Sequence, residues 1–163
     1  MPNVHRGDLD EHGDMEGFRW LSESVGRKAG SERLGASAYV LPPGEATFPY
    51  HYHLANEELL VVLEGRPHLR TPAGWRQLDS GEVVAFPVGE RGAHQLVNRT
   101  DEDVRILMVS EMRSPEISIY PDSTKVGVRE FAPGSERQGM RLNFRMGEGL
   151  DYLDGERPPE VDA

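Results

Sequence analysis

The chain has 163 residues, a formal net charge of −10 and no cysteine. This length is typical of one domain with a core of its own, so we expect a single domain over residues 1–163. Without cysteine there is no disulfide, thiolate metal site or Cys nucleophile, and a metal must be bound through nitrogen and oxygen. The acidic charge disfavours nucleic acids and anionic membranes as partners.

The N-terminal part, residues 1–33, is expected to be an extension ahead of the main fold. It begins with no apolar signal segment, and no stretch of the chain is apolar for long enough to cross a membrane, so we expect a cytoplasmic protein. The amphiphilic cluster Phe18–Leu21 predicts an additional strand or a lid.

Short runs rich in valine, leucine and aromatic residues follow, separated by turns that contain glycine and proline. Many short strands at regular spacing are typical of an all-β sandwich or closed barrel. The predicted strands are Leu34–Leu41, Leu59–Leu63, Val83–Phe86, Gln95–Asn98 and Val104–Val109.

A C-terminal extension, residues 114–163, is expected after the barrel core at about residues 34–113. It alternates short apolar pieces with polar loops, the pieces being Ile117–Tyr120, Val126–Phe131 and Met140–Met146. The polar residues from Arg157 onward are expected to be disordered.

Three histidines and a glutamate form a candidate metal site. His51 and His53 are two residues apart, so in a strand both imidazoles face the same side. A turn would bring Glu58 or its neighbour Glu57 beside them on the next strand, and His94 begins a later apolar run. Three imidazoles and one carboxylate suit one divalent transition metal ion, namely Fe, Mn, Ni, Zn, Co or Cu. Four protein ligands leave a position open for chemistry.

A pair of histidines alone is a weak signal, because such pairs are common on protein surfaces. The spacing around this pair is more specific. The first motif reads Gly44, six residues, His51-Tyr52-His53, four residues, Glu58, six residues, Gly65. The second reads Gly81, five residues, Pro87-Val88-Gly89, four residues, His94, three residues, Asn98. Both resemble the two motifs of the cupin superfamily, with the spacer after Gly44 one residue longer than usual and a longer loop before His94.

This resemblance implies an all-β double-stranded β-helix, a jelly-roll barrel, with His51, His53, Glu58 and His94 as metal ligands. It favours Glu58 over Glu57, because the four-residue gap after His53 and the six-residue gap before Gly65 both fit Glu58. Strand alternation then directs Glu58, Leu60 and Val62 inward. The chain is similar to uncharacterised single-domain bacterial cupins, some of which are called sugar-phosphate isomerases. It also implies a homodimer, with residues 1–30 and 114–135 as candidate contacts.

Most other polar residues are expected to lie away from the metal. Strand alternation directs Tyr50, Tyr52 and Gln95 to the other side of the sheet, and His68 has no ligand role in the cupin pattern. We expect Arg70 and Arg105 to be exposed on strands. Lys125 belongs to a segment that either folds over a barrel mouth or braces the dimer.

Three functions remain open. The first is a metal-dependent enzyme that acts on a small polar organic molecule, of the dioxygenase or the isomerase/lyase type. The second is a non-catalytic binding or sensor module for a small, sugar-like molecule, and the third is a structural protein with a vestigial site. Because only neutral histidine binds metal, metal affinity should fall below about pH 6.

Overall fold

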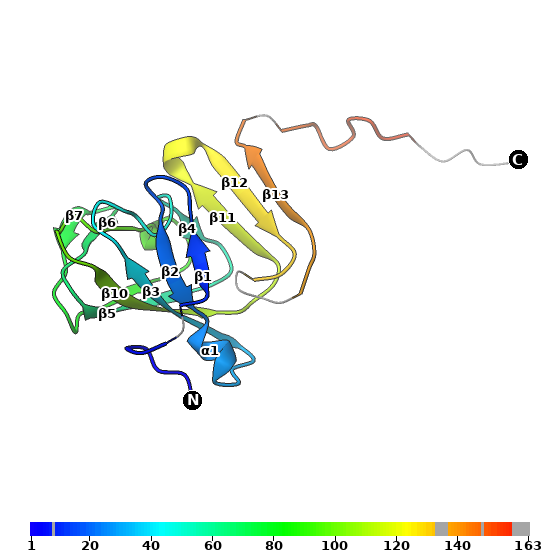
Figure 1. The fold of residues 1–163 in the computed structure, drawn as a ribbon. Coiled ribbons are helices and arrows are strands. Elements are labelled where there is room, and N and C mark those ends of the chain that lie inside the picture. Colours follow the sequence, from blue (N-terminus) through cyan, green and yellow to red (C-terminus); the bar gives the residue numbers. More distant parts are fainter. Residues whose placement is uncertain (8, 133–136, 148, 158–163) are drawn as a thin grey trace, which may run out of the picture.

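The computed structural model describes residues 1–163 except 8, 133–136, 148 and 158–163. The fold is all-β, as the sequence predicts, and its strands pair antiparallel (Figure 1). The helical elements are short: α1 (Val25–Lys28), η1 (Glu90–Gly92) and η2 (Pro121–Ser123). Among the described residues, no helix is long and apolar enough to span a membrane.

Three sheets make up the fold. The largest has the order β1-β2-β3-β10-β5-β8, and two smaller ones have the orders β7-β6-β9 and β13-β12-β11-β4. The strands are β1 (Glu11–Gly13), β2 (Trp20–Glu23), β3 (Leu34–Leu41), β4 (Tyr52–His53), β5 (Glu58–Glu64), β6 (His68–Thr71), β7 (Gly74–Gln77), β8 (Val83–Phe86), β9 (Gln95–Val97), β10 (Val104–Glu111), β11 (Glu116–Tyr120), β12 (Lys125–Arg129) and β13 (Arg141–Arg145). All five predicted core strands are present, with bounds that differ by at most two residues.

The hydrophobic core consists of inward-facing side chains from the six-stranded and the three-stranded sheet. Apolar residues at alternate strand positions share one face, so β5 and β10 contribute two of them each, and β3, β6, β8 and β9 contribute one each. Trp20 of β2 also packs against this core, so the predicted extra strand near residue 20 is present. The core residues are Leu41, Leu60, Val62, Leu69, Leu78, Phe86, Leu96, Val104 and Ile106.

The strand β5 connects this core to the candidate site. Leu60 and Val62 are buried, whereas Leu59 is exposed, as the predicted alternation requires. Glu58 is the first residue of β5, two residues before Leu60 and on the same face, so its side chain points into the barrel. Gly65 directly follows the strand and has a φ of +83°, a conformation that favours glycine.

The C-terminal extension adds a sheet beside the barrel (Figure 1). Its strands β11, β12 and β13 correspond to the three predicted apolar pieces, and β11 pairs with β4 through Ser118–His53 and Ile119–Tyr52. The extension is therefore joined to the strand that carries a candidate ligand. The predicted disorder from Arg157 onward concerns residues that, after Arg157 itself, lie outside the described ones.

Candidate metal centre

Backbone pairing brings the candidate ligands together from distant parts of the sequence. His51 and His94 form an isolated antiparallel bridge, with N–O distances of 3.1 and 2.9 Å between their backbones. His53 lies in β4, two residues on, and Glu58 opens β5. The loop before His94, longer than usual in the cupin motif, contains η1, and the backbone N–H of Gly89 donates to the His53 carbonyl at 2.8 Å.

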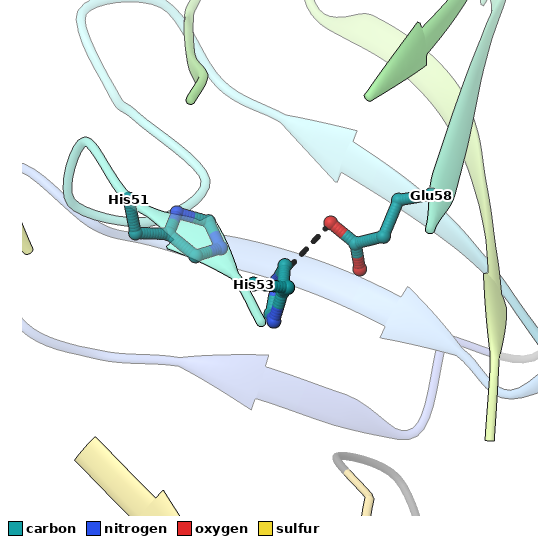
Figure 2. Close-up of side chains that lie close together, drawn as sticks. All are labelled: His51, His53 and Glu58. Atoms are coloured by element: carbon teal, nitrogen blue, oxygen red, sulfur yellow. Dashed lines mark ion pairs between the residues drawn. The ribbon is translucent and has the colours of Figure 1, made fainter. Parts of the chain in front are cut away.

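The side chains of His51, His53 and Glu58 converge on one point (Figure 2). One ligand atom from each lies within 4.8 Å of the others. The Oε2 atom of Glu58 is 3.2 Å from His53 Nε2 and 3.3 Å from His94 Nε2. The rings of His51 and His94 have centroids 4.7 Å apart, so the fourth predicted ligand belongs to the same cluster.

Each imidazole is oriented by a partner at Nδ1. His51 Nδ1–H donates to the Pro49 carbonyl at 2.8 Å, and His94 Nδ1–H donates to the Gly92 carbonyl at 2.9 Å. His53 Nδ1 lies 3.3 Å from the carboxylate of Glu116. This pattern fixes the tautomer that leaves each Nε2 free to bind a metal, and such partners are typical of metal-bound histidines.

The cluster leaves a buried nitrogen that a metal would satisfy. Among the described residues, His53 Nε2 is buried without a hydrogen-bond partner. A buried polar atom without a partner is rare and destabilising, and an unpaired imidazole nitrogen facing a carboxylate suits a bound cation. The donor set of imidazole nitrogens and one carboxylate oxygen therefore fits a divalent transition metal.

Burial and the neighbouring charges shift the ionisation of these groups in different directions. Burial, together with the charges of His94 and His53, lowers the pKa of His51 to about 3. Burial also opposes the charge on His53, but Glu116 and Glu58 outweigh it and raise the pKa of His53 to about 9. Burial would raise the pKa of Glu58, yet the imidazoles of His53 and His94, 3.2 and 3.3 Å from its Oε2, hold it below its usual value. Without metal, the proton of the cluster therefore belongs on His53.

A pocket of about 160 Å³ opens beside the four side chains. Aromatic rings brace its histidines: Phe86 stacks on His94 with centroids 3.8 Å apart, and Tyr120 stacks on His51 at 5.8 Å. The pocket is therefore a small, largely apolar space with a polar floor, which is the usual form of a small-molecule site. Its lining residues are Tyr39, Phe48, Pro49, His51, His53, Glu58, His94, Met108, Ser118, Tyr120 and Arg129.

The other residues considered in the sequence lie outside this lining. Glu57 is exposed, and Tyr50, Tyr52, Gln95 and His68 do not line the pocket, as predicted. The remaining three have partners of their own. Arg70 pairs with Asp122, Arg105 donates to the Val4 carbonyl, and Lys125 lies 5.2 Å from the centroid of the Tyr120 ring.

Four residues of the C-terminal extension take part in the site without having been identified in the sequence. Glu116 is fully buried, and both it and Ser118 approach His53 Nδ1, while Tyr120 and Arg129 line the pocket. Asn56, also buried, donates a side-chain hydrogen bond to Glu116 and so fixes its carboxylate. The alternation of polar and apolar residues in 116–120 was a signal, but no local pattern pairs that strand with β4.

Comparison with known proteins agrees with this fold. Residues 38–110 match the Cupin domain family. None of the curated proteins matches the chain. Among solved structures, a protein of Acidithiobacillus ferrooxidans named “Putative sugar phosphate isomerase” has a TM-score of 0.75 and 22% identity, covering 85% of this chain and 86% of that one.

Two further solved structures are similar. A protein of Silicibacter pomeroyi named “sugar phosphate isomerase from a cupin superfamily” has a TM-score of 0.72 and 26% identity, and the match covers 89% of this chain and 82% of that one. The polyketide cyclase RemF of Streptomyces resistomycificus has a TM-score of 0.56 and 24% identity, and the match covers 71% of this chain and 83% of that one. Together with the family match, the two motifs and the jelly-roll strands, these likenesses show that residues 38–110 of this chain form a cupin domain.

Proposed function

We propose that this protein is a metal-dependent enzyme acting on a small polar organic molecule, with His51, His53, Glu58 and His94 as the metal ligands. The observation that carries the proposal is the orientation of the histidines. Each imidazole has its Nδ1 occupied by a carbonyl or carboxylate, so each Nε2 is available in the cluster. This is the arrangement by which proteins prepare histidines for a metal.

The pocket supports catalysis rather than a closed structural site. Four protein ligands leave one or two positions open on a five- or six-coordinate ion, and the pocket of about 160 Å³ lies beside them. A bound metal would supply Lewis-acid polarisation or, as Fe(II), a position for dioxygen. The chain's own residues would orient the substrate and exclude water. We favour the isomerase or lyase version, because the Silicibacter pomeroyi protein, 26% identical, is named a sugar phosphate isomerase.

The alternative is a binding or sensor module that uses the metal only to orient a small, sugar-like molecule. The same pocket and ligands serve both functions, so only turnover separates them. An isomerase converts its substrate in a reaction that stops when the metal is chelated and resumes when it is returned. A sensor binds the same molecule and releases it unchanged.

The direct test is metal content. Protein purified without added metal, and metal-free protein titrated with Ni²⁺, should each give about one ion per chain by elemental analysis and calorimetry. His51→Ala should reduce uptake strongly, whereas His12→Ala, which changes an exposed histidine of β1, should leave it unchanged. Equal uptake by wild type and His51→Ala would reject the ligand assignment, and no uptake by the wild type would reject the proposed function.

We also propose a homodimer, which the exposed edge of the C-terminal sheet supports. β13 is the end strand of that sheet, and all five of its residues are exposed, including Leu142 and Phe144. Such a strand is an aggregation hazard unless another chain covers it. Light scattering should give twice the chain mass, and Leu142→Lys with Phe144→Lys should yield monomers. A monomeric wild type would refute the dimer.

A further inference from the structure

An arginine of the C-terminal extension lies at the pocket beside the candidate metal centre. Arg129 ends β12 and lines the pocket together with the three histidines and Glu58. The register explains this position, because Arg129 is directly opposite Glu116 of β11. Directly opposed residues project from the same face of a sheet. Since Glu116 approaches His53, the face that carries Arg129 is the one turned to the site.

Within the described part of the chain, the Arg129 guanidinium has neither an ion pair nor a side-chain hydrogen bond. Its cross-strand neighbour Glu116 is fully buried and is engaged with His53 and Asn56. By contrast, Arg70 and Arg105 both have oxygen partners. The guanidinium of Arg129 thus offers up to five N–H donors to a molecule in the pocket.

The surroundings of Arg129 would strengthen an ionic contact between its guanidinium and a molecule in the pocket. Tyr39, Phe48 and Met108 form an apolar wall of the pocket, where an ionic contact is weakened less by solvent than at the surface. The chain as a whole carries a net charge of −10, which repels small anions. A half-buried cation at the pocket therefore supplies the local attraction that an anionic molecule needs to enter.

We propose that Arg129 binds an anionic oxygen group, a carboxylate or a phosphate, of the molecule that occupies the pocket. The inference rests on the proposed function and narrows its substrate class to small organic anions. A planar guanidinium binds both groups through two parallel hydrogen bonds. The volume of about 160 Å³ is close to that of a cavity that accommodates benzene, about 150 Å³, so the rest of the molecule is small.

Calorimetric titration with three compounds tests the proposal: glycolate, glycerol 3-phosphate and uncharged glycerol. Each is added to metal-free and to Ni²⁺-loaded protein at low ionic strength. The proteins are the wild type, Arg129→Gln, Arg129→Lys and the control Arg66→Gln. Arg66 lies just beyond the far end of β5, and that end is six residue steps, roughly 20 Å, along the strand from Glu58. Arg66 is exposed and pairs with Asp79, and its substitution by Gln changes the charge by the same amount as Arg129→Gln.

The wild type and Arg66→Gln should bind one of the two anions and not glycerol, and the tighter of the two identifies the group. Arg129→Gln should bind that anion about 10–100-fold more weakly, and Arg129→Lys should be intermediate. Circular dichroism establishes that the variants fold. Equal affinity in the wild type and Arg129→Gln, or no anion binding by the wild type, would overturn the proposal.

The same titrations separate this proposal from the proposed function. Anion binding that depends on Arg129 in a chain that takes up no metal would reject the enzyme and retain the anion site. Metal uptake together with anion binding that does not depend on Arg129 would retain the enzyme and reject the anion site.

Discussion

The pH dependence of metal binding is the sharpest consequence of the site's electrostatics. In the metal-free protein, Glu116 and Glu58 outweigh burial and raise the pKa of His53 to about 9. His51, with a pKa lowered to about 3, takes up no proton in the neutral range. A metal ion must therefore displace one proton from His53, so affinity rises with pH until the pKa is passed.

The magnitude follows from the position of that pKa. With a pKa of about 9, only about 1% of His53 is neutral at pH 7 in the metal-free protein, so proton competition weakens binding about 100-fold, or about 2.7 kcal/mol. The affinity should increase about tenfold per pH unit between pH 6 and 8. An ordinary histidine would show this slope only below about pH 6.5. The sequence alone predicts that metal affinity falls only below about pH 6. The structure predicts that it already falls between pH 8 and pH 6, because the pKa of His53 is raised.

Removal of the Glu116 charge should alter this profile in a characteristic way. Glu116→Gln keeps the size of the side chain, but it removes a carboxylate 3.3 Å from His53 Nδ1, so the pKa of His53 should fall. The increase of metal affinity with pH should then level off at a lower pH than in the wild type. Above pH 8.5 the variant should bind metal about 10–100-fold more weakly than the wild type, because a partner that orients the ligand and raises its basicity is lost.

The assay is calorimetric titration of Ni²⁺ at half-unit steps from pH 6 to 9, in pairs of buffers that differ in ionisation enthalpy. The buffer pairs count the proton released on binding. Glu57→Gln is the matched control, since Glu57 is exposed and carries the same charge. A wild-type affinity that does not change between pH 7 and 8.5, or no proton released at pH 7, would refute the reasoning.

Three further substitutions test what holds the barrel around the site, each by chemical denaturation. Leu69→Ala should destabilise the fold by about 2–5 kcal/mol, because Leu69 is fully buried in the core; a loss below about 1 kcal/mol would mean that the core is placed wrongly. Gly65→Ala should cost about 1–2 kcal/mol, since φ is +83° and an added Cβ would lie 2.9 Å from Val104 Cγ2; an unchanged midpoint would argue against this turn. Asn98→Ala should cost about 2–4 kcal/mol, because its amide donates to the Leu41 and Glu102 carbonyls, yet metal uptake should persist; loss of uptake in a folded variant would indicate that Asn98 supports the ligands directly.

The sequence determined the strands through local patterns, and it indicated the barrel and the candidate ligands through the spacing of the two cupin-like motifs. Alternating apolar residues predict strands, and the spacing of His51, His53 and Glu58 places them on one face of neighbouring strands. The choice of Glu58 over Glu57 followed from the spacing of the cupin-like motif, and in the structure Glu57 is exposed while Glu58 faces the cluster.

Only the tertiary structure decided what surrounds those ligands. The strand β11 pairs with β4 over a separation of about 65 residues, and no local pattern encodes such a partner. That pairing brings Glu116 to His53 and, through the next strand, Arg129 to the pocket. The raised pKa of His53 and the anion site proposed at Arg129 both depend on long-range contacts, which is why the sequence indicated a metal site and the fold was needed to indicate its chemistry.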